Sequence, residues 1–317
     1  MKLGRPIGLA CAALLAATIG VAAVVASGTE PTSIKVPHIP PARPAASVDR
    51  AVLMLARQDG RRVVALSLRR AGTAARATVT VLDPEGRPVN GLAVRIDGGI
   101  DARPCGRGCY RALVPGAASG GRLRVHVRGQ GVRAFMTFHL PGHWPVPARN
   151  LLGRAERALR NAGTLAYRDR LESSSGHTLT TSWHVVAPDR LSYDIDNGTS
   201  AVIVGRWRWD RPAGSTRWVG SRQEPRLALP ALPWGTHVQN VYRLNPPAGR
   251  RGKFVRLSLY DPSTPAWYEV TLDARSFHIR SVQMVAPSHF MLDDYAAYDL
   301  PLRIAAPHGR HEGRRRT

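Results

Sequence analysis

The sequence predicts a mainly β protein with two domains behind a hydrophobic N-terminal helix. Short segments in which apolar and polar residues alternate, separated by turn residues, recur from Val52 to residue 141 and again from residue 164 to about residue 300. One amphipathic helical pattern divides the two sets, and 317 residues are too many for one ordinary domain. We therefore expect an antiparallel β-sandwich first, and then an antiparallel sheet whose apolar face is covered by the helix.

The N-terminal segment is expected to place the body of the protein outside the cytoplasm. Lys2 and Arg5 precede the uncharged, mostly apolar run Ile7–Ala26. As a helix with a rise of about 1.5 Å per residue, this run spans about 30 Å, the thickness of the hydrocarbon core of a membrane. Residues 1–27 are then either a retained transmembrane anchor or a signal peptide cut before Ser27. The first case puts the body at the extracytoplasmic face of the cell membrane, and cleavage near Ala26 makes it secreted or periplasmic.

Two proline-rich stretches mark the domain boundaries. Residues 28–47 lack periodicity and are expected to form an extended linker. Pro141–Pro147 separates the sandwich, residues 48–141, from the second domain, residues 148–306. The last residues, 307–317, form a basic tail that we expect to be disordered.

Cys105 and Cys109 are expected to form a disulfide. Gly106 and Gly108 between them allow a tight loop, and an exported protein meets an oxidising compartment. A zinc site would need two further thiols or nearby histidines, which the neighbouring sequence lacks.

A single soluble helix is predicted at the start of the second domain. Leu151, Leu152, Ala155, Leu159 and Ala162 fall on one helical face, and a glycine at residue 163 is a natural stop after the last turn. About ten strand-like segments follow it, so the helix is expected to cover the apolar concave face of their sheet.

Several local motifs in the second domain resemble the lipoprotein-carrier superfamily of LolA/LppX-type half-barrels. After the opening helix these motifs are a strand that ends in a polar turn (Tyr167 to Gly176), the runs Thr181 to Tyr193 and Val202 to Asp210, and two late segments, Pro265 to Asp273 and His289 to Tyr295. The resemblance implies an antiparallel half-barrel sheet wrapped on one or a few helices, with a concave face that shelters acyl chains.

The first domain resembles the immunoglobulin-like modules of CopC/CopD-type copper-resistance proteins. The resemblance rests on Leu82-Asp83, on Gly86, Pro88 and Gly91 at the family's spacing, and on the Cys-Gly-Arg-Gly-Cys-Tyr motif that follows. It implies an immunoglobulin-like β-sandwich ahead of the half-barrel.

From these resemblances we expect an exported, membrane-associated binding protein that carries lipid or another hydrophobic ligand outside the cytoplasmic membrane. Burial of each CH₂ group of such a ligand contributes about 0.8 kcal/mol. Apolar residues that alternate inward would line the cavity, although an ordinary filled core remains the alternative. The candidates are Leu165, Tyr167, Trp183, Val185, Leu191, Tyr193, Val202, Trp234, Val255, Leu257, Trp267 and Met284.

Trp234 belongs to the apolar, proline-rich segment Leu227–Gly235, which is expected to be either a lid that touches the membrane through this tryptophan or a buried crossover loop.

A periplasmic copper-handling accessory and an envelope sensor or protein-interaction module remain alternative functions. Thioether and imidazole groups suit copper, and Met136, His139 and His143 lie close together in sequence. The Pro-Gly pair before His143 makes a shared site unfavourable, so no metal and no cofactor is expected. An enzymatic role is not expected either, because the carboxylates that neighbour each other on strands face opposite sides and no nucleotide-binding or nucleophile motif is present.

The formal net charge of +23, which comes almost entirely from arginine, bears on the partners. A surface this basic is attracted to anionic lipid headgroups, so the membrane is an expected partner. Nucleic acid is not expected, since no nucleic-acid-binding motif accompanies the charge. A neighbouring membrane transport protein is a further candidate partner.

Overall fold

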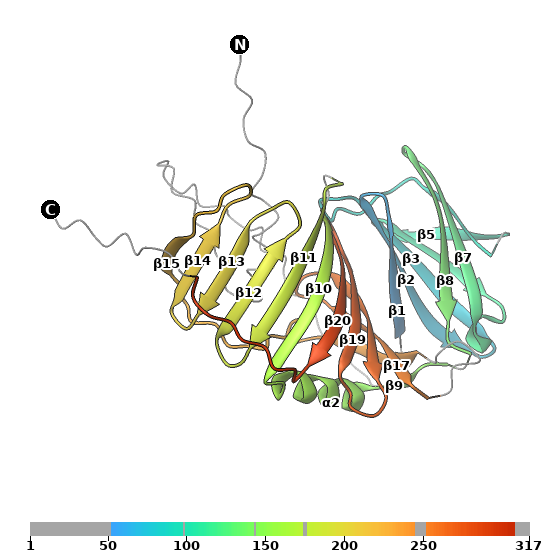
Figure 1. The fold of residues 1–317 in the computed structure, drawn as a ribbon. Coiled ribbons are helices and arrows are strands. Elements are labelled where there is room, and N and C mark those ends of the chain that lie inside the picture. Colours follow the sequence, from blue (N-terminus) through green and yellow to red (C-terminus); the bar gives the residue numbers. More distant parts are fainter. Residues whose placement is uncertain (1–51, 98, 143, 174–175, 245–251, 308–317) are drawn as a thin grey trace, which may run out of the picture.

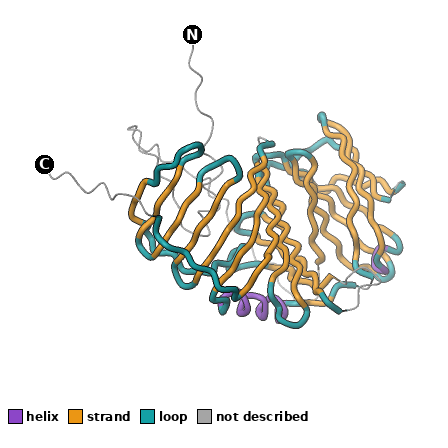
Figure 2. The backbone as a smooth tube through the Cα atoms, in the orientation of Figure 1, coloured by secondary structure: helices purple, strands orange, loops and turns teal. Residues whose placement is uncertain are grey.

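A computed structural model describes residues 52–97, 99–142, 144–173, 176–244 and 252–307 and shows two antiparallel sheets lying side by side (Figures 1 and 2). The mainly β prediction is confirmed. One α-helix, α2 (Arg149–Arg160), and one 3-10 turn (Ala117–Ser119) are present in the described part. No helix in this part is long and apolar enough to cross a membrane. The predicted N-terminal helix, the linker and residues 308–317 of the tail lie outside the described residues.

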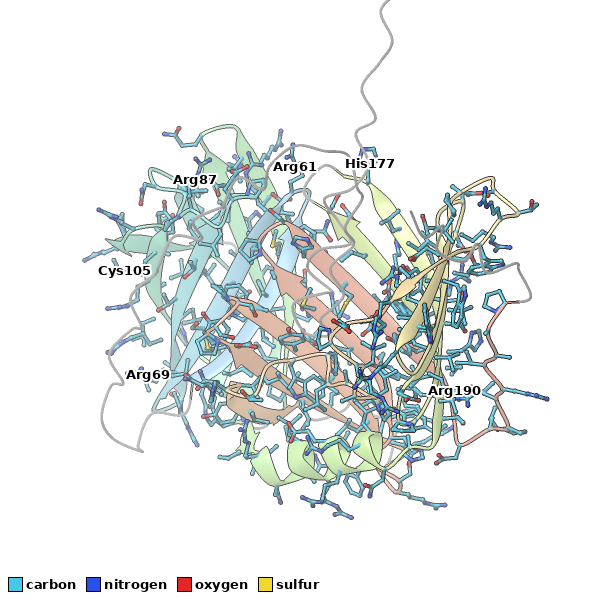
Figure 3. The ribbon with its side chains drawn as sticks, turned by 90° about the vertical axis from the view of Figure 1, so that its left-hand side faces the viewer. Arg61, Arg69, Arg87, Cys105, His177 and Arg190 are labelled. Atoms are coloured by element: carbon cyan, nitrogen blue, oxygen red, sulfur yellow. A yellow bond between two sulfur atoms is a disulfide. The ribbon has the colours of Figure 1, made fainter. Side chains whose placement is uncertain are left out.

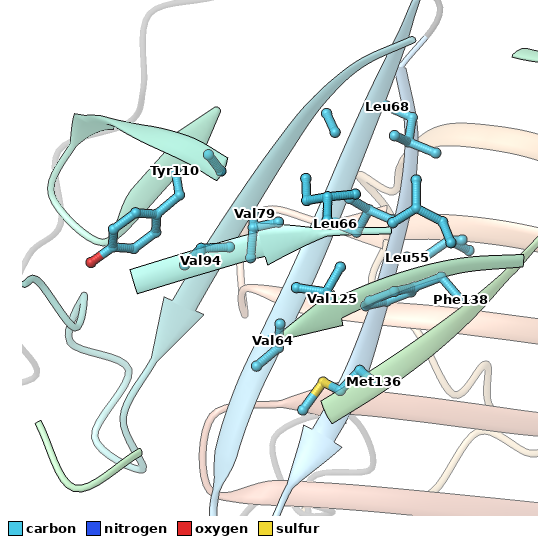
Figure 4. Close-up of a cluster of buried hydrophobic side chains, with 14 of the residues drawn as sticks. Leu55, Val64, Leu66, Leu68, Val79, Val94, Tyr110, Val125, Met136 and Phe138 are labelled. Carbon is cyan, nitrogen blue, oxygen red and sulfur yellow. The ribbon is translucent and has the colours of Figure 1, made fainter. Parts of the chain in front are cut away.

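The first sheet has eight strands in the order β1-β2-β3-β6-β5-β4-β7-β8. The strands are β1 (Val52–Asp59), β2 (Arg62–Ala71), β3 (Ala74–Leu82), β4 (Ala93–Ile96), β5 (Ile100–Gly106), β6 (Cys109–Val114), β7 (Gly121–Gly129) and β8 (Val132–Leu140). The beginning of β5 pairs with β4 and its end pairs with β6. The sheet therefore folds over at β5 into two layers that enclose one apolar core (Figure 4).

Strict alternation explains why these residues form strands with one buried face. In β7, Leu123, Val125 and Val127 are fully buried and Arg124 and Arg128 are exposed. This pattern gives one apolar face and one solvated face in an antiparallel strand.

Tyr110 on β6 fixes the connection between β3 and β4. Its hydroxyl donates to Val89 O at 3.1 Å and accepts from Leu92 N at 3.0 Å, while its ring fills the core. Two of the buried polar groups of this connection are thereby satisfied. Next to it, the hairpin of β5 and β6 brings Cys105 and Cys109 to disulfide distance, with Cα atoms 5.1 Å apart.

The second sheet has twelve strands in the order β15-β14-β13-β12-β11-β10-β20-β19-β18-β17-β16-β9 and curves into a nearly closed barrel. The strands are β9 (Val146–Pro147), β10 (Thr164–Ser173), β11 (Thr178–Val186), β12 (Arg190–Ile195), β13 (Ser200–Val204), β14 (Trp207–Arg211), β15 (Val219–Arg222), β16 (Gln239–Leu244), β17 (Phe254–Asp261), β18 (Ala266–Asp273), β19 (Ile279–Ala286) and β20 (His289–Tyr298). The first long strand, β10, pairs with the last, β20, in the middle of the sheet, so residues far apart in sequence are neighbours there.

Helix α2 lies across one end of the strands of the barrel (Figure 1). Leu152, Ala155 and Leu159 on its apolar face are buried in the barrel core. They are the central residues of the face that the sequence predicts. The last turn carries Arg157 and Arg160, which favour the C-terminal end of a helix.

The segment 223–238, called the crossing segment below, runs from β15 to β16. Leu227, Trp234 and Val238 are buried in the barrel core, and the backbone N of Leu229 donates to Pro188 O at 2.9 Å. The crossing segment therefore packs against the inner face of the sheet as it runs from β15, at one edge of the sheet, to β16, near the other edge.

The two sheets share an apolar interface. It is formed by Ala56, Val63, Ala65 and Leu82 from the first sheet and by Trp267, Val285 and Phe290 from the barrel. Beside it, Glu269 accepts from Arg57 at 2.5 Å and also pairs with Arg256. The glutamate is largely buried, so these two guanidinium groups compensate a charge that would be costly alone.

Candidate functional site

The interior of the barrel contains most of the predicted cavity residues. Pairing register and core membership determine which side of each strand faces inward. Leu165, Trp183, Val185, Leu191, Val255 and Leu257 belong to the buried core, and Tyr167, Tyr193 and Met284 pack against it. The structure thus brings residues from β10, β11, β12, β17 and β19 together around one interior.

Val202 and Trp267 require a correction, because neither lines the interior. On β13 it is Ile203, opposite Leu191, that lies in the barrel core, so the adjacent Val202 points outward. On β18 the inward residue is Tyr268, and Trp267 packs in the interface with the first sheet. Val202 lies in the apolar run Ala201–Val204, in which alternation does not reveal the inner face. In β18, Glu269, Thr271 and Asp273 share the face of Trp267, so alternation there does indicate that Trp267 points outward.

Trp234 is not exposed at a membrane interface. It is 2 % exposed, and its indole Nε1 donates to Glu156 Oε1 of α2 at 3.1 Å. Its ring meets Tyr268 edge-on at 6.3 Å. The crossing segment is therefore the buried crossover that the sequence left open, and it connects α2 to the inner wall.

A ladder of four aromatic rings crosses the inner wall. Tyr295, Tyr167, Trp183 and Tyr193 are directly opposite one another on β20, β10, β11 and β12. The ring centroids of successive members are 4.9, 5.8 and 4.9 Å apart. Aromatic pairs at such distances contribute about 0.5–1.5 kcal/mol beyond their buried area. Tyr167 stacks with both Tyr295 and Trp183, whereas the ring of Tyr193 is tilted by 47° from that of Trp183. The ladder is therefore mainly apolar and carries the hydroxyl groups of its three tyrosines.

Two buried carboxyl groups lie next to this ladder. Asp169 and Asp293 are directly opposite on β10 and β20, and they are 1 % and 3 % exposed. Trp183 Nε1 donates to Asp169 Oδ2 at 2.9 Å. The Oδ1 atom of each aspartate has no hydrogen-bond partner within the described residues. Such unsatisfied buried acceptors are rare in folded proteins and call for an explanation.

Burial controls the ionisation of the pair. It raises the pKa of Asp169 to about 6, although the hydrogen bond from Trp183 opposes this rise. Burial, together with the nearby charges of Asp169 and Asp294, raises the pKa of Asp293 well above its usual range. Two carboxyl groups at one site disfavour double ionisation, and burial and this repulsion both raise the pKa of Asp293.

A cationic group completes the polar part of the inner wall. Arg208 on β14 lies opposite Ile203 and is 9 % exposed. It donates to the Tyr193 hydroxyl at 2.9 Å and pairs with Asp210 at 2.7 Å. One end of the aromatic ladder therefore meets the carboxyl pair, and the other meets a guanidinium group.

Not all of the inward side chains are fully buried. Tyr167, Tyr193 and Met284 point inward and yet keep part of their surface accessible. An apolar wall with a few convergent polar groups and perturbed pKa values is typical of a ligand site. This arrangement can hold an amphiphile whose apolar body lies on the rings and whose polar group donates hydrogen bonds to the carboxyl pair.

The sequence analysis missed Asp169, Asp293 and Arg208. The sequence did contain an indication that Asp169 points inward. It alternates with Leu165, Tyr167 and Leu171 along one predicted strand. A charged residue at an inward position of an apolar face indicates either a partner or a function.

The weak copper candidates are not brought together. Met136 is buried in the core of the first sheet (Figure 4), whereas His139 is exposed on the opposite face of β8. His143 lies outside the described residues. Among the residues that the structure does describe, no group of three or more His, Cys, Asp or Glu side chains is placed to hold a metal ion.

No protein-family model matches this chain, and a search of curated proteins finds no match.

Proposed function

We propose that this protein is an extracytoplasmic binding protein, not an enzyme, that carries an amphiphilic ligand inside the barrel. The observation that carries the proposal is the inward aromatic ladder, in which Tyr167 and Tyr193 are partly accessible, beside two carboxyl groups with unsatisfied oxygens. The apolar body of a lipid or similar amphiphile would cover the ladder. Each CH₂ group removed from water would contribute about 0.8 kcal/mol.

The polar end of the ligand would lie at Asp169 and Asp293. A hydroxyl, amide or ammonium group there would give the free Oδ1 atoms the partner that they lack. An ammonium group would in addition favour ionisation of Asp169.

The finer fold assignments form part of the same proposal. The eight-stranded sheet would be an immunoglobulin-like module, and the barrel would be a relative of the LolA/LppX-type lipoprotein carriers, with α2 over one end. The pair Cys105–Cys109 at disulfide distance supports an exported protein, since disulfides persist in oxidising compartments.

The test compares an inward and an outward tryptophan substitution. Met284→Trp places a larger side chain at a half-buried inward position, whereas Leu292→Trp enlarges an outward side chain that is 42 % exposed on the neighbouring strand. Binding of a fluorescent fatty-acyl amine is measured by titration of the full chain and of each variant.

We expect the unsubstituted chain and Leu292→Trp to bind the probe with equal affinity and Met284→Trp to bind it at least tenfold more weakly. Thermal unfolding by circular dichroism confirms that each variant is folded. Equal binding by all three chains, or no binding by the unsubstituted chain, would overturn the proposal.

A further inference from the structure

The outer face of the first sheet carries a shallow groove of about 410 Å³ with arginine at its sides. Arg76, Arg103 and Arg111 come from β3, β5 and β6, and all three side chains are exposed. Leu113 lies among them and is 57 % exposed, with Ile100 and Pro104 completing an apolar floor. Cys105 lines the same groove and is labelled in Figure 3 together with Arg69 from β2.

Strand pairing forces these cations together. Arg103 is directly opposite Arg111, Arg76 is opposite Leu113, and Arg69 is opposite Arg76 on the other side. Like charges directly opposite each other destabilise a sheet. Within the described residues, no carboxylate forms an ion pair with Arg76, Arg103 or Arg111. The carboxylate that lines the groove, Asp101, pairs with Arg95 at 2.8 Å instead.

We propose that this groove binds an anionic phospholipid at a membrane surface. The phosphate lies between the guanidinium groups, whose planar donors suit it, and the glycerol and first acyl carbons lie on Leu113. The apolar floor distinguishes a lipid from a free anion, because a hydrated ion gains nothing from an exposed leucine. The proposal does not depend on the function proposed for the barrel.

The groove lies on the same face of the first sheet that contacts the barrel. Val63, Ala65 and Arg69 occupy alternate positions on the same face of β2, and the first two are buried against the barrel. The arginine groove is therefore the uncovered part of a sheet face whose other part already contacts the barrel. A lipid bound there would hold the barrel beside the membrane surface.

The test uses soluble short-chain lipids, so that the apolar N-terminal segment does not dominate. Dihexanoyl phosphatidylglycerol, dihexanoyl phosphatidylcholine and inorganic phosphate are titrated calorimetrically, each lipid below its micelle concentration, into the full chain. The groove variant is Arg103→Gln/Arg111→Gln. The control, Arg124→Gln/Arg128→Gln, removes the same charge from exposed positions on β7.

We expect the groove variant to bind phosphatidylglycerol about thirtyfold more weakly, from roughly 1 kcal/mol per arginine near an anionic lipid, and the control to change less than threefold. Leu113→Gln should weaken phosphatidylglycerol binding while leaving phosphate binding unchanged. Both groove variants should melt no lower than the unsubstituted chain, since they relieve like-charge contacts or alter an exposed residue.

Three results would overturn the proposal. Equal losses in the groove and control variants would mean diffuse attraction to the net charge. Phosphate binding as tight as phosphatidylglycerol binding would mean a site for a free anion. Binding of the phosphatidylcholine analogue as tight as that of phosphatidylglycerol would mean that the arginines do not select the headgroup.

Discussion

The substitution Asp169→Asn should make the protein more stable at neutral pH. The side chain keeps its shape and an oxygen that can accept from Trp183 Nε1, which lies 2.9 Å from Asp169 Oδ2. It also gains an amide that can donate toward the unsatisfied Oδ1 of Asp293 across the strand pair. What it loses is a carboxyl group that is 1 % exposed and whose ionisation opposes folding.

The magnitude follows from the pKa of Asp169, which rises from 3.8 to about 6 on folding. Between these values the unfolded chain has released the proton and the folded chain still holds it, so the free energy of unfolding falls as pH rises. Two pH units at about 1.4 kcal/mol each give a loss of roughly 3 kcal/mol. Asp169→Asn removes this loss, and hence the variant should match the unsubstituted chain at pH 4 and exceed it by roughly 3 kcal/mol at pH 7.5.

Urea unfolding followed by tryptophan fluorescence at several pH values between 4 and 8 measures this difference. Asp273→Asn serves as a control of opposite sign, which should lower the free energy of unfolding by a constant amount across this pH range. Backbone N–H groups of Ser276 and Arg275 lower the pKa of Asp273 to about 2, so its carboxylate stabilises the folded state above pH 4 and this contribution is lost as pH falls toward 2. A stability difference for Asp169→Asn that is constant across the pH range, or a variant less stable at pH 7.5, would refute the reasoning.

Two further substitutions test the framework that holds the sheets. Tyr110→Phe removes the hydroxyl that bonds to Val89 O and Leu92 N, so thermal or urea unfolding should show a loss of about 1–3 kcal/mol, whereas no loss would mean that water replaces both bonds. Glu269→Gln leaves two guanidinium groups at the interface without their charged acceptor, so the free energy of unfolding should fall by roughly 1–3 kcal/mol. This loss should become smaller at high salt. An unchanged free energy of unfolding would show that the two ion pairs only offset the cost of their own desolvation.

Periodicity was sufficient to predict the β-rich fold and the face of α2, because one side of each element faces solvent. In β7 the alternation of valine and arginine is unambiguous, and Leu152 and Leu159 repeat at helical spacing. The same reasoning failed for Val202, because β13 is apolar on both faces. It failed for Trp267 because the outer face of β18 is polar at Glu269 and Thr271 but apolar at Trp267, where it packs against the first sheet.

The carboxyl pair could not be predicted from one sequence for a different reason. Asp169 and Asp293 are brought together by the pairing of β10 with β20, the two ends of the barrel domain. The two aspartates are far apart in the sequence. Only the register of this long-range strand pair reveals that their carboxyl groups lie side by side. The crossing segment was likewise ambiguous, since apolar residues such as Leu227 and Trp234 suit a membrane lid and a buried crossover equally well.

The ligand content of the purified protein tests the central claim most directly. The full chain and the Met284→Trp variant are purified in parallel, extracted with organic solvent and analysed by quantitative mass spectrometry. Both chains keep the apolar N-terminal segment, so lipid held there cancels in the comparison. We predict an amphiphile near one equivalent in the unsubstituted chain and well below that in Met284→Trp. Equal lipid content in the two chains, or no amphiphile in the unsubstituted chain, would contradict the assignment of the barrel interior as a ligand site.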